Sequence, residues 1–273
     1  GADIVIENNK IIGVGVQGRV DVPSGAEVRD ISGKFVVPGF VDPHAHWFEI
    51  RREILEPNQW SFLANLAHGV TSGLDVQPFT VDVFGYQDMI DAGLMLGPRA
   101  YSTGPGVFVD SEIKSEADAR AVLSRYRDYN RTGNIKSYMV GGRKERQFMI
   151  QGASALGMMP TTEGATDLRM NLTHALDGFA GNEHSLPVTP LHKDVVQLFA
   201  QSRIAYTPTI GVLYGGRPAL WEMSIRHAPK EDVKLQRFVP VPLIDVKTRM
   251  LKWSRHADQT YPSFAADAVA IQR

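Results

Sequence analysis

Apolar positions along most of the chain follow two alternating patterns. Short apolar runs that end in small or polar residues lie at 39–47, 69–76, 98–106, 134–142, 157–164, 178–186 and 203–213. Amphipathic spacing predicts helices between them, at 57–68, 115–130, 143–157 and 190–202. Strands that alternate with helices are typical of parallel βα units. Because each run closes in a polar or Gly-rich loop, the pattern favours a (β/α) barrel over an open sheet.

The first forty or so residues differ and predict a small β-element. Two β-branched runs, at 4–6 and 11–14, flank Asn8-Asn9, a pair typical of hairpin turns. Further strand is predicted over 27–39. We therefore expect two parts, 1–36 and 37–273. An eighth barrel strand would follow 267–273, so we expect the barrel to lack its last strand in this sequence.

Composition and charge narrow the possible functions. Lys and Arg number 29 against 30 Asp and Glu, a balance that excludes a strongly basic nucleic-acid binder. No stretch approaches the ~20 apolar residues of a membrane span, so we expect neither a nucleic-acid nor a membrane partner. Cysteine is absent, so any metal must be held by histidine, carboxylate or modified lysine.

One glycine motif is misleading. Residues 13–18 fit GxGxxG, but dinucleotide binding also requires a helix directly after the motif. The following residues contain a proline and a turn and have no helical periodicity, so we interpret the segment as a glycine-rich hairpin.

His44 and His46 are the strongest local candidates for metal ligands. They close an apolar run, and side chains at i and i+2 of a strand point the same way, so both imidazoles can reach one cation. Neutral histidine nitrogens are good zinc ligands. Two surface histidines on a loop are the alternative that this spacing leaves open.

The string VVPGFVDPHAHW at 36–47 resembles the first barrel strand of the amidohydrolase superfamily, whose members usually show PGxxDxHxH there. The N-terminal element is similar to that family's small β-sandwich. Residues 135–210 look most like amidohydrolase regions beside Tol-type β-propellers in long, frequently exported bacterial proteins of the imidazolonepropionase and prolidase-like branch. The resemblance implies an α/β fold: a small β-sandwich element at 1–36 and an incomplete TIM-type (β/α)8 metal-dependent hydrolase barrel at 37–273. It favours an extracytoplasmic location.

The same resemblance implies three further ligands. Lys136 ends the fourth run, where binuclear members carry a carboxylated lysine that bridges two cations; an exposed lysine is the alternative. His184 ends the sixth run and is implied as a ligand of the second cation. Glu163 ends the fifth run, where the family usually has histidine, and carboxylate oxygen also binds zinc. His174, on a predicted helix, competes with Glu163 for this role, and we favour Glu163.

Aromatic residues at strand ends are candidates for substrate contacts. Tyr206 precedes Thr207-Pro208-Thr209, a string similar to a pocket-lining segment of the family, and Tyr138 closes the fourth run. We expect Tyr138 and Tyr206 to contact substrate. Trp47 and Tyr101 are placed in the same way, and core packing is the alternative for each.

The resemblance implies metal-dependent hydrolysis of a C–N bond, in an amide, a cyclic amide or an Xaa-Pro-like peptide. A metal-activated water would attack a small molecule or short peptide, with one or two divalent cations per chain, zinc first among them, and Lys136 and His184 as catalytic residues. The alternatives are a non-catalytic scaffold or binding protein, and a mononuclear deaminase. Neither Asp258 nor Asp267 is expected to replace the family's eighth-strand aspartate. A homo-oligomer is not excluded.

Overall fold

The computed structural model describes residues 1–50, 54–108, 111–138, 140–164, 166–209, 230–248 and 261–272. The chain divides into two compact units, Gly1–Pro38 and Gly39–Arg273, and each is considered by itself. The described helices of the second unit are η1 (Phe48–Ile50), α1 (Trp60–Ala67), α2 (Asp82–Asp91), α3 (Glu116–Asp128), α4 (Arg143–Ala155), α5 (Leu168–Asp177), α6 (Lys193–Ser202), α8 (Val233–Phe238), α9 (Val241–Thr248) and α10 (Tyr261–Gln272).

The first unit is built on a β-hairpin, as its sequence predicts. Strand β1 (Ala2–Glu7) pairs antiparallel with β2 (Lys10–Val16). Asn8 and Asn9 form the turn with φ of 47° and 64°, and two-residue hairpin turns need positive φ at both positions. The glycine-rich motif at 13–18 lies in and just after β2, with no helix behind it, which confirms the hairpin interpretation.

The strand expected over 27–39 is absent, and this prediction was wrong. The structure shows no regular element in this segment, where the side chains of Val28 and Phe35 are 84% and 96% exposed. A strand forms only where a neighbouring edge can pair with its backbone groups, and among the described strands β1 and β2 pair only with each other. The β-sandwich character of residues 1–36 stays a prediction.

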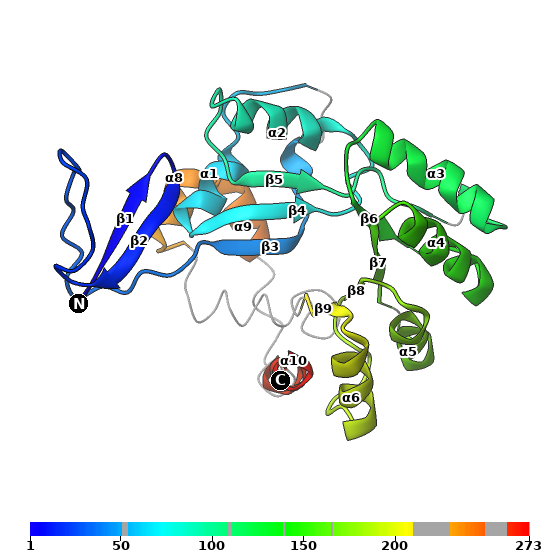
Figure 1. Ribbon diagram of the computed structural model, residues 1–273. Coiled ribbons are helices and arrows are strands. Elements are labelled where there is room, and N and C mark those ends of the chain that lie inside the picture. Colours follow the sequence, from blue (N-terminus) through cyan, green and yellow to red (C-terminus); the bar gives the residue numbers. More distant parts are fainter. Residues whose placement is uncertain are drawn as a thin grey trace. The chain divides into compact units, whose positions relative to one another are not determined.

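The second unit contains the parallel strands that the sequence predicts (Figure 1). They are β3 (Phe40–Ala45), β4 (Val70–Asp75), β5 (Arg99–Ser102), β6 (Asn134–Ser137), β7 (Met159–Glu163), β8 (Gly181–Glu183) and β9 (Ala205–Thr207). β3-β4-β5 form one sheet and β6-β7-β8-β9 another. A parallel bridge between Val107 and Ser137 joins the loop after β5 to β6. The parallel α/β fold is confirmed, and closure into a barrel stays a prediction.

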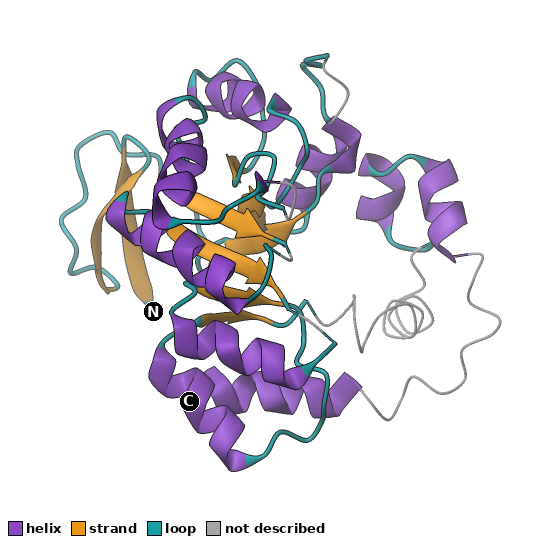
Figure 2. Ribbon diagram, turned by 90° about the vertical axis from the view of Figure 1, so that its right-hand side faces the viewer, coloured by secondary structure: helices purple, strands orange, loops and turns teal. Residues whose placement is uncertain are grey.

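Helices flank the strands of this unit (Figure 2). The predicted helices are confirmed as α1, α3, α4 and α6. Ser115 caps α3 by accepting a hydrogen bond from the Asp118 N–H, which satisfies an otherwise unpaired amide of the first turn. Leu123 of α3, Met149 of α4 and Ile135 of β6 lie in one buried apolar cluster. Helices α3 and α4 therefore share one apolar core with strand β6.

The last described helix, α10, packs against α6. Its Asp267 carboxylate accepts hydrogen bonds from the Thr189 hydroxyl at 2.7 Å and the Leu191 N–H at 3.0 Å. Asp267 thus holds a loop, in agreement with the expectation that it does not replace the family's catalytic aspartate; Asp258 lies outside the described residues. Among the described helices, none combines the length and the apolar character that crossing a bilayer requires.

Two leucines offer a matched test of this packing. The Leu123 side chain is fully buried, whereas that of Leu94 is 74% exposed. Leu123→Ala should lower the free energy of unfolding by about 2–5 kcal/mol, because it leaves a cavity in the core. Leu94→Ala should change it by less than about 0.5 kcal/mol. Urea denaturation monitored by circular dichroism measures both, and equal midpoints for the two variants would contradict the packing described.

Candidate metal centre

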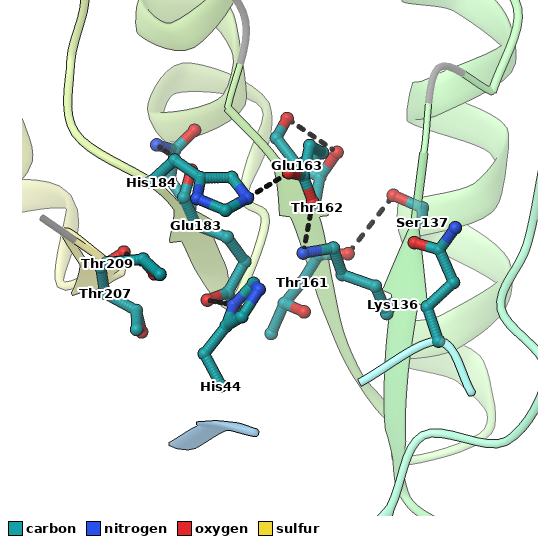
Figure 3. A network of polar contacts seen from close by, with 12 residues as sticks. His44, Lys136, Ser137, Thr161, Thr162, Glu163, Glu183, His184, Thr207 and Thr209 are labelled. Atoms are coloured by element: carbon teal, nitrogen blue, oxygen red, sulfur yellow. Dashed lines mark hydrogen bonds and ion pairs between the residues drawn. The ribbon is translucent and has the colours of Figure 1, made fainter. Parts of the chain in front are cut away.

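Ligand atoms from three strands meet at the carboxyl ends of the sheets. One ligand atom each of His44, Glu163 and His184 lies within 4.8 Å of the others. His44 lies on β3, Glu163 is the last residue of β7, and His184 directly follows β8. Figure 3 shows these side chains and that of Lys136 pointing toward one another. Active sites of parallel α/β folds lie at this end of the strands.

His44 lies on β3, and His46 directly follows its last residue. The Asp42 carboxylate accepts a hydrogen bond from the His44 N–H at 3.0 Å and fixes the backbone there. The rings of His44 and His46 are 5.0 Å apart, and the ring of His44 is 4.9 Å from that of His184. His44 is buried, whereas His46 is exposed and stacks on Phe48. The role of His46 as a ligand stays a prediction.

An unusual backbone conformation directs His184 into the centre. Its φ is 69°, which non-glycine residues adopt only at a cost of about 1–3 kcal/mol when the surroundings impose it. Its N–H donates to the Thr207 carbonyl at 2.7 Å, which continues the pairing of β8 with β9. The ring then contacts the Glu163 carboxylate through Nε2. Such local strain is typical of functional sites.

Glu163 and Lys136 form a pair inside the centre. The Lys136 side chain is 1% exposed, and its Nζ lies 2.6 Å from Oε2 of Glu163. Burial by itself raises the pKa of Glu163, but the hydrogen bond from His184 and the charge of Lys136 outweigh it and lower the pKa to about 2. Glu163 is therefore a carboxylate at neutral pH. The alternative of an exposed Lys136 does not hold.

The sequence analysis did not select Glu183, yet its side chain also faces this centre. Its Oε2 lies 2.6 Å from Nδ1 of His44, and both side chains are almost fully buried. Glu183 and Glu163 are directly paired neighbours across β8 and β7. In the sequence, the only indication of a role for Glu183 is its position at the end of a predicted strand, directly before His184.

The donor set of this centre suits a divalent cation. Nε2 of His44 and Nδ1 of His184 are buried without a hydrogen-bond partner, and a buried polar atom in that state calls for an explanation. Two adjacent carboxylates, Glu183 almost fully buried and Glu163 partly buried, face only one lysine ammonium within the described centre. A cation bound by two imidazoles and a carboxylate would satisfy these atoms and add the missing positive charge, as zinc sites with His and Glu ligands do.

Two other candidates lie on the helix side of the strands. His174 of α5 is fully buried, and its Nδ1 lies 2.9 Å from the Asn182 side-chain oxygen, which agrees with the preference for Glu163. The Tyr206 hydroxyl accepts a hydrogen bond from the Leu186 N–H at 2.9 Å, and its ring packs edge-on against Phe199 of α6. The expected substrate contact of Tyr206 stays a prediction.

Tyr138 lies in a row of aromatic rings. Phe79, after β4, stacks on Phe108, after β5, with ring centroids 5.5 Å apart, and Phe108 lies 6.2 Å from Tyr138, after β6. The Tyr138 N–H donates to the Val107 carbonyl, which extends β6 by one residue. Tyr138 and Lys136 are two positions apart on this extended strand, so they share a face. Trp47, in contrast, is buried against Phe62 in the core.

Comparisons with known proteins support the fold. A structure from Bifidobacterium longum assigned as a prolidase matches with a TM-score of 0.64 and 20% identity, over 98% of this chain and 66% of its own. An Xaa-Pro dipeptidase with bound methionine matches with a TM-score of 0.57 and 16% identity, over 97% of this chain and 70% of its own. Phenylurea hydrolase B matches with a TM-score of 0.58 and 17% identity, over 74% of this chain and 60% of its own.

In sequence, an adenine deaminase from Bacillus pumilus is 35% identical over 71 residues, which are 26% of this chain and 11% of the deaminase. No protein-family model matches the chain. The chain thus spans about two thirds of the solved structures that it resembles, and a small fraction of the deaminase.

Metal content tests the centre directly. His44→Ala should reduce bound zinc from about one equivalent or more to near zero after dialysis, because it removes one of the three proposed ligands. His192→Ala is the matched control, since His192 is exposed at the start of α6 and makes no side-chain cap. Elemental analysis of folded protein measures both. Equal zinc in the two variants would place the site elsewhere.

Proposed function

We propose that this chain, which shares its fold with members of the amidohydrolase superfamily, is a metal-dependent hydrolase of C–N bonds. The substrate class is an amide, a cyclic amide or an Xaa-Pro-like peptide. The observation that carries the proposal is the convergence of His44, Glu163 and His184 within 4.8 Å at the carboxyl ends of parallel strands. The prolidase and dipeptidase matches support the choice of bond, since both names denote cleavage at proline.

His44, Glu163 and His184 would hold the metal, zinc before other divalent ions because of the nitrogen donors. When bound, the metal supplies a Lewis acid and a water of lowered pKa. The surrounding residues would exclude water and supply fixed charge. Burial of His44 and Lys136 excludes bulk water and strengthens electrostatic interactions in the centre. Glu163, ionised because its pKa is about 2, provides a fixed negative charge at neutral pH.

Phe79, Phe108 and Tyr138 would contact an apolar or aromatic part of the substrate. Phe79 is 65% and Tyr138 38% exposed, so the row offers ring surface to a ligand. Aromatic side chains that line clefts favour ligands with apolar or planar groups. This placement supports Tyr138 as a substrate contact.

Activity should depend on metal. We expect the zinc- or manganese-loaded chain to hydrolyse at least one member of a panel of Xaa-Pro dipeptides, N-acyl amino acids and cyclic amides. Treatment with 1,10-phenanthroline should abolish turnover, and added zinc should restore it. His184→Ala should lower kcat/KM by about 100-fold or more, because loss of this metal ligand weakens binding of the metal that activates the water. Liquid chromatography of the products measures turnover.

The alternatives give different results in the same assay. Release of ammonia from adenine, without cleavage of the panel, would favour a mononuclear deaminase, which the short deaminase match makes the second candidate. A stoichiometric metal with no turnover on any substrate would favour a binding or scaffold role. Turnover that persists without metal would contradict the proposal.

Lys136 is proposed to carry a carboxylate when two cations bind. Its Nζ is buried beside Glu163, where a carbamate would add a bridging ligand. Bicarbonate should then raise bound zinc from about one toward two per chain in the wild type, and not in Lys136→Ala. Lys136→Glu should retain part of the second equivalent, because it supplies a carboxylate. Incubation with ¹³C-bicarbonate, followed by NMR, detects the carbamate.

Lys193→Ala is the control, since Lys193 is exposed at the first position of α6. It should behave as the wild type. If bicarbonate changes neither the ¹³C spectrum nor the zinc content, Lys136 remains an ion-pair partner of Glu163 and the centre holds one metal.

A further inference from the structure

We propose that Glu183 is the positioning residue of this centre, which holds the His44 ring so that Nε2 is presented to the metal. The Glu183 carboxylate lies 2.6 Å from Nδ1 of His44, in a pair whose side chains are 3% and 5% exposed. Glu183 does not belong to the group of residues whose ligand atoms converge. The inference rests on the proposed metal centre and assigns to Glu183 a role within it.

The two ring nitrogens of His44 have different surroundings. Nδ1 faces the Glu183 carboxylate, and because an ionised carboxylate can only accept a hydrogen bond, this contact favours the tautomer with its hydrogen on Nδ1. Nε2 then has a free lone pair, and it is the buried atom that has no hydrogen-bond partner. Contact with Glu183 therefore selects the tautomer that binds a metal. A carboxylate behind a metal-bound histidine also makes the ring a stronger donor.

The backbone holds Glu183 rigidly in this place. Its Cα pairs with Glu163 on β7 and with Thr207 on β9, so β8 is central in its sheet at this residue. Its carbonyl accepts a hydrogen bond from the Gly164 N–H at 2.8 Å. A Cβ on Gly164 would lie 2.4 Å from that carbonyl, so only glycine fits this approach. Side chains held by such rigid strands orient a ligand more accurately than side chains on loops.

The neighbouring residue provides a matched control. Asn182 also faces Nδ1 of a buried histidine, His174, at 2.9 Å, but on the helix side of β8. Asn182→Ala thus removes a comparable buried acceptor from the same strand, together with the 3.4 Å hydrogen bond from Nδ2 of Asn182 to the Glu183 carbonyl, and leaves the Glu183 side chain in place. A loss of metal affinity shared by Glu183→Ala and Asn182→Ala would come from loosening of β8, whereas a loss confined to Glu183→Ala reports positioning.

The test measures zinc affinity and the His44 tautomer in the full chain. By calorimetry with a competing chelator, Glu183→Ala should weaken zinc binding by about 10- to 100-fold, as loss of such a partner does in other metal sites. Glu183→Gln should lose less than Glu183→Ala, because its amide oxygen still accepts from Nδ1. In ¹⁵N-histidine NMR of metal-free protein, His44, assigned with His44→Asn, should hold its hydrogen on Nδ1 in the wild type and shift toward Nε2 in Glu183→Ala.

The outcomes separate the two proposals. If Asn182→Ala weakens zinc binding as much as Glu183→Ala, or if the His44 tautomer does not change, the positioning role is overturned. If Glu183→Gln loses as much affinity as Glu183→Ala, the carboxylate binds the metal directly and the inference is again wrong. If Glu183→Ala behaves as expected while the wild type hydrolyses no C–N substrate, the proposed reaction fails and the positioning role stands.

Discussion

Glu163 and Glu183 lie opposite each other on β7 and β8, where Glu163 is partly buried and Glu183 almost fully buried. Like charges in directly paired positions repel, and burial strengthens the repulsion because less water screens it. Each carboxylate has at least one positively charged or hydrogen-bonding partner. Lys136 and His184 contact Glu163, and His44 contacts Glu183. The centre is therefore built around compensating two negative charges, and a bound dication would complete the compensation.

That arrangement depends on which way each strand presents its side chains. Successive residues of a strand face opposite sides, so Glu183 points inward while Asn182 points toward His174 of α5. Tyr206, paired with Asn182 across β8 and β9, faces the helix side as well. His184 departs from this alternation because its φ is 69°, and so two consecutive side chains, Glu183 and His184, enter one centre.

Much of this could be predicted from the sequence. Hydrophobic periodicity located the parallel strands and the main helices, because burial imposes the pattern directly. His44 could be found from its spacing with His46 at the end of a strand, whereas Glu163 and His184 followed from the resemblance of the strand-end motifs to a known family. The contact of Glu183 with the centre could not be predicted, because consecutive residues of a regular strand face opposite sides. Only the positive φ of His184 brings both side chains into one centre, and a backbone angle cannot be read from the sequence. The strand expected over 27–39 failed because strand formation depends on a partner edge rather than on local sequence.

A single metal site made by His44, Glu163 and His184 is the central claim, and anomalous diffraction at the zinc edge tests it most directly. Crystals grown with zinc should show an anomalous peak about 2.0–2.2 Å from Nε2 of His44, a carboxylate oxygen of Glu163 and a ring nitrogen of His184. The Glu163–His184 contact should open to admit the ion. A peak elsewhere, with the Lys136–Glu163 pair and the Glu163–His184 contact intact, would contradict the claim.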